Sequence, residues 1–270
     1  MGVLQSSFAD DEDDEVQGYD DPTEPARQVR WILCELGLPT ELVLEIMDLA
    51  DYHPAVFVEL ETLVKLNANA YTPEDPCSSR LYLITPPIPG PREGENWRMR
   101  KVTWYLEGRD QGWGGEHPGT FNGAWSWYEA CIFRPDRTTR SSPEAENAQN
   151  EDLTAFLHAH YLHRTTPDIV PVLEKLRVGW SLVPAEGGKV SWDIQSNKVA
   201  GKDYGRYTVE WRAGEPADAD LAKGRGEGDG KGFIDALQPG DRVGLLMRAQ
   251  FPGWQNTLRQ ASVELMYEVR

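Results

Sequence analysis

Polar and aromatic side chains that could bind a ligand gather in two glycine-rich segments of the sequence. The first runs from Arg109 to Gly115 and continues from Gly119 to Trp127, and the second surrounds Trp254. Glycine beside an aromatic ring permits a tight turn and leaves the ring face accessible, while Asp, Asn and Gln side chains can hydrogen-bond hydroxyl groups. This combination favours binding of a sugar or a peptide. The candidate ligand-binding residues are Asp110, Trp113, Asn122, Trp125, Trp254 and Asn256.

The same residues have a structural alternative. Tryptophan at the end of a strand can fill the end of a β-sandwich, and a buried aspartate can accept hydrogen bonds from the amides of its own loop. We expect at least half of these tryptophans to lie in the core. Exposure of Trp113 and Trp254 in one cleft, beside Asp110 or Asn122, would favour ligand binding instead.

The sequence lacks recognised catalytic motifs. It contains neither a Gly-x-Ser-x-Gly nucleophile motif nor a His-Glu-x-x-His zinc motif. No Cys or carboxylate completes a zinc set with His158, His160 and His163. The segment Gly224–Gly232 has the pattern of neither a phosphate-binding loop nor an EF-hand. We predict a protein that is not an enzyme and holds no metal or cofactor, although a carboxylate pair for glycoside chemistry could be concealed among the 44 acidic residues.

The charge of the chain is acidic and unevenly distributed. There are 27 Lys and Arg against 44 Asp and Glu, which gives a net charge of −17. Nine carboxylates and no Lys or Arg lie in residues 1–25. Like charges at this density oppose folding, so we predict a disordered acidic tail over residues 1–25. The acidic balance also argues against nucleic acid as a partner and against adsorption to anionic membranes.

The cysteines and the first residues indicate an intracellular protein. Cys34, Cys77 and Cys131 are widely spaced and odd in number, which fits a reducing compartment, cytoplasmic or nuclear. The chain shows no signal peptide and no apolar run of about 18 residues that would predict a transmembrane helix. Gly2 followed by Ser6 fits the N-myristoylation pattern, so a membrane role is expected only through this modification.

Hydrophobic spacing predicts two helices followed by a large β domain. Apolar side chains at helical spacing predict a helical hairpin over residues 26–53. Over residues 54–270 the period changes to two, with about nine strands separated by Pro and Gly turns. We therefore predict a mainly β fold, an antiparallel jelly-roll-like β-sandwich with a short N-terminal helical hairpin. A polar surface insertion is expected at residues 134–166 and a flexible glycine-rich loop at residues 212–232.

The second helix of the predicted hairpin carries a family motif. Its sequence Leu38-Pro39-Thr40-Glu41-Leu42-Val43-Leu44-Glu45-Ile46 resembles the start of an F-box, with a Leu-Pro-x-Glu-Leu pattern and an isoleucine about four residues later. In that family the helix buries its apolar face against the Skp1 adaptor of a ubiquitin ligase, as a helix in a groove. The second half of an F-box is not matched, because residues 56–59 have a strand pattern. The resemblance implies partner contacts by Leu38, Pro39, Leu42, Val43, Ile46 and Leu49.

The layout of the whole chain resembles fungal F-box-like proteins that carry a C-terminal sandwich of the F-box-associated or galactose-binding-like type. Segments 180–183, 240–243 and 261–265 are similar to strands of such sandwiches. The resemblance implies a substrate receptor, in which the hairpin recruits the adaptor and the sandwich loops hold a target. Two alternatives stay open: the hairpin packs on the sandwich of its own chain, or the protein is a lectin-like carbohydrate-binding protein that uses its Trp loops.

Overall fold

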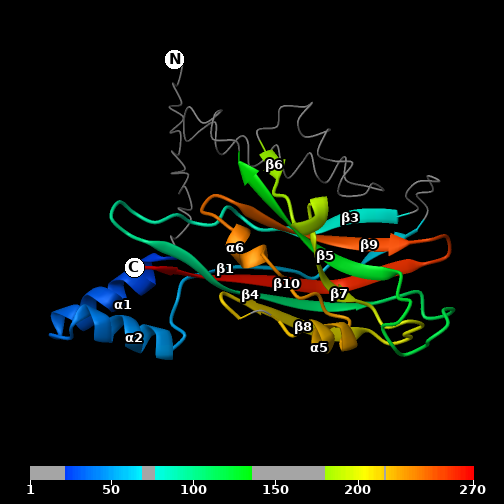
Figure 1. The fold of residues 1–270 in the computed structure, drawn as a ribbon, viewed down its shortest axis with the longest axis horizontal. Helices are drawn as coiled ribbons and strands as arrows, with labels where there is room; N and C mark the ends of the chain where they lie inside the picture. The colour runs from blue at the N-terminus through cyan, green and yellow to red at the C-terminus, as the bar shows by residue number, and fades with distance from the viewer. Residues whose placement is uncertain (1–21, 69–76, 136–179, 216) are drawn as a thin grey trace, which may run out of the picture.

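The computed structural model describes residues 22–68, 77–135, 180–215 and 217–270. Two antiparallel sheets stack as a sandwich, and two helices lie beside one end of it (Figure 1). One sheet contains β1 Ala55–Leu60, β2 Val64–Asn67, β4 Trp97–Arg109, β8 Gly205–Arg212 and β10 Gln255–Val269. The other contains β3 Cys77–Ile84, β5 Ser126–Pro135, β6 Trp180–Leu182, β7 Trp192–Ser196 and β9 Arg242–Gln250. The prediction of a mainly β, antiparallel sandwich is confirmed.

Strands that are neighbours in a sheet are mostly distant in the chain. One sheet has the order β1-β10-β4-β8, with β2 also paired to β10, and the other has the order β3-β9-β5-β6, with β7 also paired to β5. The consecutive strands β3, β4 and β5 therefore alternate between the two sheets. The jelly-roll part of the prediction is more specific than this sandwich and stays a prediction.

The core lies between the sheets, because alternate residues of each strand point inward. Along β4, the alternate residues Val102, Trp104 and Leu106 are fully buried. The Trp104 ring meets Trp211 edge-on at a centroid distance of 6.1 Å and Phe233 at 6.4 Å. These rings join β4, β8 and the short helix α6 Phe233–Ala236 in one aromatic cluster. The same alternation in β10 buries Val263, Leu265 and Tyr267.

The predicted helical hairpin consists of α1 Glu24–Glu35 and α2 Thr40–Leu49. Gly37 ends α1 with a φ of 87°, and the amide of Leu38 donates to a carbonyl in the last turn of α1, which is the usual glycine-terminated helix end. The end of the predicted disordered tail, residues 1–25, is wrong at Glu24 and Pro25, because both residues belong to α1. Residues 1–21 lie outside the described residues.

A small apolar cluster of its own holds the hairpin together. Ala26 of α1 packs with Val43 and Met47 of α2, and this cluster is separate from the sandwich core. The hairpin therefore forms an extension at the end of the sandwich, where Figure 1 shows it beside the C-terminal end of β10.

Polar contacts join the hairpin to the sandwich. Arg27 of α1 donates from Nε and Nη2 to the two carboxylate oxygens of Glu95, at 3.0 and 2.8 Å. Arg270 donates to the Asp48 carboxylate of α2 at 2.8 Å. The hydroxyl oxygens of Thr23 and Tyr267 form a buried hydrogen bond of 2.9 Å. Charged and hydroxyl groups thus set how the hairpin sits on the sandwich.

The glycine-rich loop predicted to be flexible at residues 212–232 has more structure than expected. It contains the helix α5 Ala219–Gly224, which Asp218 caps by accepting hydrogen bonds from two backbone amides. The indole nitrogen of Trp211 donates to a carbonyl of the loop at 3.2 Å. Gly230 has a φ of 59°, and a Cβ there would lie 2.3 Å from the Trp211 ring, so only glycine fits. The described part of the loop therefore packs against the sandwich.

Other predictions fall on residues that are not described. Of the insertion predicted at residues 134–166, only Arg134 and Pro135 are described, and they belong to the end of β5. The histidines of residues 158–163 and the modification pattern at Gly2 lie outside the described residues. Within the described ranges, none of the helices has the length and apolar character needed to cross a bilayer.

Candidate functional site

Apolar side chains on α2 face solvent in a single stripe. Leu42, Ile46 and Leu49 follow at the spacing of one helical face and are 48%, 42% and 82% exposed. Val43 and Met47, on the neighbouring face of the helix, are buried against α1. We call Leu42, Ile46 and Leu49 the α2 stripe. Its exposure contradicts the alternative in which this face packs on the chain's own sandwich.

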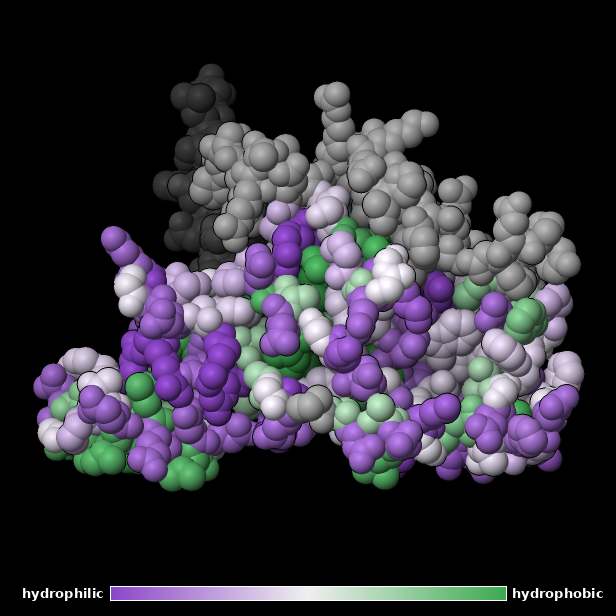
Figure 2. All heavy atoms as spheres, viewed as in Figure 1, coloured by the Kyte–Doolittle hydropathy of each residue, from purple (hydrophilic) through white to green (hydrophobic). Residues whose placement is uncertain are grey.

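The rest of the hairpin adds to this apolar surface. Trp31 in α1 is 64% exposed, and Ile32 and Leu36 are exposed as well. Figure 2 shows hydrophobic side chains gathered over α1 and α2, at the lower left of the view. Among the other residues predicted to contact a partner, Pro39 is exposed and Leu38 is half-buried. The prediction for Val43 is wrong, because its side chain is fully enclosed between the two helices.

The two predicted tryptophan loops meet at the end of the sandwich opposite the hairpin (Figure 1). Trp113 is 65% exposed and lies beside Gly253, where a Cβ would be 3.8 Å from its ring. Trp254 is half-buried and lies beside Gly115, where a Cβ would be 3.6 Å from its ring. Folding therefore brings the loop after β4 against the loop before β10, and one of the two indoles faces solvent.

Trp125 and Asn122 lie elsewhere around this end. The Trp125 ring is exposed and contacts Phe251 edge-on at a centroid distance of 4.6 Å. Asn122 is exposed and lines a hollow of about 360 Å³ together with Phe121 and Trp127. Trp113 and Trp254 do not line that hollow. The candidate residues thus form several surfaces around one end of the sandwich and not a single cleft.

Asp110 and Asn256 have structural roles in place of the predicted ligand contacts. Asp110 is buried, and its carboxylate accepts hydrogen bonds from the amides of Gly112 at 2.7 Å and Ala200 at 2.5 Å. Burial raises the pKa of Asp110, and the amide hydrogen bonds act in the opposite direction. Asn256 is also buried, and its amide donates to one carbonyl of β5 and one of β9 at 2.8 and 3.0 Å. A ligand cannot reach either side chain.

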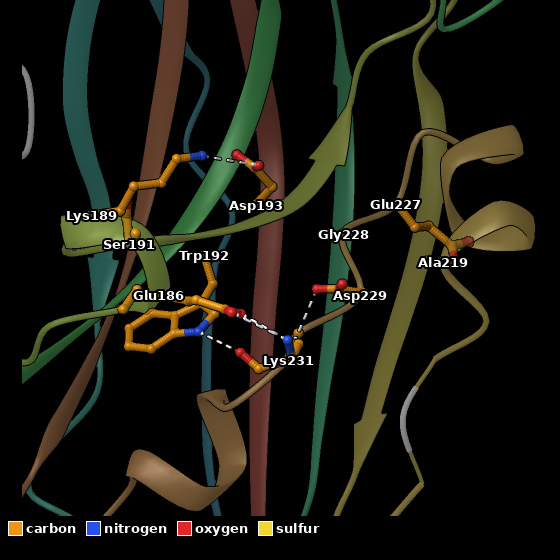
Figure 3. Close-up of a pocket in the computed structure, with 13 residues that line it drawn as sticks. Glu186, Lys189, Ser191, Trp192, Asp193, Ala219, Glu227, Gly228, Asp229 and Lys231 are labelled. Carbon is orange, nitrogen blue, oxygen red and sulfur yellow. Dashed lines mark hydrogen bonds and ion pairs between the residues drawn. The ribbon is translucent and has the colours of Figure 1, made fainter.

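A charged hollow that the sequence did not predict lies beside β7 and is shown in Figure 3. Its volume is about 430 Å³, and the indole of Trp192 beneath it donates to the Lys231 carbonyl at 3.0 Å. The Lys231 ammonium lies 2.9 Å from the Glu186 carboxylate, and Lys189 lies 3.8 Å from Asp193. These residues come from two distant segments, 186–193 and the one that carries Lys231, so their spacing in the sequence gave no indication of the hollow.

Two carboxylates near this hollow belong to neighbouring strands. Asp193 is directly opposite Glu129 in the pairing of β7 with β5. Glu129 is buried, and its oxygens accept hydrogen bonds from the Trp127 indole at 2.7 Å and the Ser191 hydroxyl at 2.8 Å. Both oxygens of the Glu129 carboxylate are therefore engaged within the protein. The part of the chain that the structure describes also contains no group of three or more His, Cys, Asp or Glu residues suited to a metal ion.

Comparisons with known proteins show a distant likeness to a solved structure. No family model matches the chain, and no curated protein is similar to it. A crystal structure of the decameric BFDV capsid protein is similar to this chain at 14% sequence identity and a TM-score of 0.30. The match covers 81% of this chain and 98% of the capsid protein. A likeness at this TM-score carries no argument about function.

Proposed function

We propose that this protein is a non-catalytic interaction protein whose hairpin binds a partner protein through the α2 stripe. The observation that carries the proposal is the exposure of Leu42, Ile46 and Leu49 at the spacing of one helical face. Apolar anchors at this spacing are how an amphipathic helix enters a hydrophobic groove. Full burial of each such side chain contributes about 1.5–3 kcal/mol, so a partner that covers all three gains a large share of its binding free energy from them.

The partner class follows from the sequence of the helix. The resemblance of residues 38–46 to the start of an F-box indicates an adaptor of the Skp1 type. Pro39 is exposed and Leu38 is half-buried, so both remain partly accessible beside the stripe. The hairpin and the loop that carries Trp113 lie at opposite ends of the sandwich, so an adaptor on the hairpin leaves those loops free (Figure 1). In this proposal the protein is a substrate receptor that holds a target at the end of the sandwich opposite the hairpin.

The double variant Leu42→Asp/Ile46→Asp tests the stripe. It is expected to weaken binding to a purified Skp1-type adaptor by at least about a hundredfold, because two apolar anchors are replaced by charges. Calorimetric titration of the full chain measures the dissociation constant, and circular dichroism follows the fold. Leu63→Asp/Leu221→Asp is the matched control, since both leucines are 57% exposed and lie outside the hairpin.

Three results separate the parts of the proposal. Loss of binding in the stripe variant alone, with an unchanged circular dichroism spectrum, supports both the surface and the partner class. Absence of binding by the unaltered chain rejects the adaptor. Equal binding by the unaltered chain and the stripe variant rejects the α2 stripe as the contact surface.

Exposure of Trp113 favours carbohydrate binding as a second candidate function. A solvent-facing indole beside glycines offers a flat apolar face on which a sugar ring can stack. Trp113→Ala is expected to weaken binding to a glycan identified on a glycan array by about tenfold, because stacking contributes about 0.5–1.5 kcal/mol beyond buried area. Trp31→Ala is the control, since Trp31 is equally exposed at the other end of the molecule. No glycan retained by the unaltered chain, or the same loss in both variants, would remove this candidate.

A further inference from the structure

A small basic hollow lies next to the tryptophan loops. Its volume is about 270 Å³, and the charged side chains that line it are Arg109, Lys198, Lys202 and Asp203. Three cations and one carboxylate make this lining basic, although the whole chain has a net charge of −17. A concave surface lined by one sign of charge concentrates ligands of the opposite sign. The local charge therefore favours an anion.

Arg109 is built into the wall of this hollow. Its Nη1 donates to the Lys202 carbonyl at 2.6 Å, and its guanidinium lies 4.9 Å from the centroid of the Tyr204 ring. Its Nε is enclosed by the protein and is not open to a ligand, so the accessible part of the guanidinium and its positive charge are what Arg109 offers to the hollow. An oxygen atom of a bound anion is the kind of acceptor that a guanidinium prefers.

Nearby carboxylates are already engaged by other groups. Glu107 lies 2.9 Å from Arg206 and 2.5 Å from Arg259, so it is held by two guanidiniums. Arg259 also lies over the Tyr204 ring, at 4.7 Å from its centroid. The carboxylate of Asp110 is buried and accepts hydrogen bonds from backbone amides. These carboxylates therefore do not cancel the charge of the lining lysines.

The loop that carries the two lysines is held in an unusual conformation. Ala200 lies between Lys198 and Lys202 and has a φ of 53°, in the left-handed region that is unfavourable for residues other than glycine. The Asp110 carboxylate accepts a hydrogen bond from the Ala200 amide and so stabilises this turn. The turn places both lysines in the lining of the same hollow. Asp110 is thus a positioning residue for the basic hollow.

We infer that the basic hollow binds a phosphate, sulfate or carboxylate group, either as a free anion or as part of a small ligand. Arg109, Lys198 and Lys202 supply the charge-assisted hydrogen bonds that such oxygen-rich groups need. The hollow is large enough for one such group with a small moiety attached. This site is separate from the hairpin, so it does not depend on the proposed partner.

Calorimetric titration of the full chain tests the inference. The probes are inorganic phosphate, sulfate, citrate, glucose 6-phosphate and O-phosphotyrosine, with glucose and tyrosine as neutral counterparts. At least one anionic probe is expected to bind saturably, and more weakly as sodium chloride is raised. Lys198→Gln/Lys202→Gln is expected to weaken that binding by at least about tenfold. The control Lys189→Gln/Lys231→Gln removes the same charge from the hollow of Figure 3 and is expected to change it by less than about twofold.

The outcomes distinguish the source of the anion and the role of the site. Inorganic phosphate or sulfate that binds as tightly as the organic phosphates identifies a free ion as the ligand, and tighter binding of an organic probe identifies a ligand-borne group. Absence of saturable binding by every anionic probe overturns the inference. Equal weakening by the two lysine pairs also overturns it, because the effect would then arise from net charge alone. Thermal unfolding of both variants confirms that they remain folded.

Discussion

Replacement of Trp104 by alanine is expected to lower the free energy of unfolding by about 3–5 kcal/mol. Trp104 is fully buried at the centre of the sandwich, where its ring contacts Trp211 and Phe233 edge-on. Truncation removes one of the two indoles of this cluster and leaves a cavity between β4, β8 and α6. Urea unfolding followed by circular dichroism measures the loss. Trp113→Ala, at an exposed loop position, is expected to change stability by less than about 0.5 kcal/mol.

Replacement of Trp104 by phenylalanine is expected to cost much less, under about 2 kcal/mol. The indole nitrogen of Trp104 is buried and has no hydrogen-bond partner among the residues that the structure describes. Phenylalanine has no such donor, so the free-energy cost of the unsatisfied indole nitrogen disappears. This offsets part of the free energy lost with the packing contacts. An equal loss of stability in the phenylalanine and alanine variants would contradict a buried, unsatisfied indole nitrogen at Trp104.

The second large effect is expected for Glu95→Gln, which should lower the free energy of unfolding by about 2–3 kcal/mol at neutral pH. The Glu95 carboxylate receives two hydrogen bonds from Arg27 and one from the Arg92 amide, and Arg30 lies 3.5 Å away. Removing its charge takes away the nearer carboxylate beside the largely buried guanidinium of Arg27, at 2.8 Å, and leaves Glu24 at 3.9 Å. The exposed Glu93 lies in the same loop, and Glu93→Gln is expected to leave stability unchanged.

The pH dependence of stability provides an independent check on Glu95. The hydrogen bonds from Arg27, more than any other contact, hold the pKa of Glu95 at about 2, below the ordinary value of 4.5. Because the pKa is lower in the folded protein, the carboxylate stabilises the fold fully above pH 4.5. This contribution is lost as the pH falls from 4.5 towards 2. The stability difference between unaltered protein and Glu95→Gln should therefore shrink over this interval, as urea unfolding at a series of pH values would measure. A stability difference that stays constant down to pH 2 would contradict a lowered pKa for Glu95 in the folded protein.

The helical hairpin and most of the strands could be predicted from the sequence because hydrophobic period is a local property. The end of the first helix is local as well, because Gly37 terminates it by adopting a positive φ. Strand β2 was missed because its four residues are too few for alternation to be distinctive, and its pairing with β10 is what makes it a strand. Helix α5 was missed although Asp218 supplied a recognisable N-terminal capping residue.

The candidate sites could be predicted only in part, because they depend on tertiary contacts. The sequence indicated Leu42, Ile46 and Leu49 as one face, but it could not determine whether that face meets solvent or the sandwich. The sequence around Asp110 was consistent both with binding of a ligand and with hydrogen bonds to loop amides. The structure shows the second, because Asp110 accepts a hydrogen bond from the amide of Ala200, 90 residues away in the chain. The basic hollow could not be predicted from the sequence. Its residues Arg109 and Lys198 are far apart in the chain and are brought together by the pairing of β4 with β8.

The central position of β10 has a kinetic consequence. This strand pairs with β1, β2 and β4, and residues as distant as Glu59 and Gln260, 201 positions apart, are joined by a hydrogen bond across it. The entropy of closing so long a loop must be overcome before such contacts return any free energy. Folds dominated by distant strand pairs reach the native state in milliseconds to seconds, which is slow for a small domain. Until β10 is in place, the edges of β1 and β4 that it covers are open to pairing with other chains, so this topology makes the protein most prone to aggregate before folding is complete.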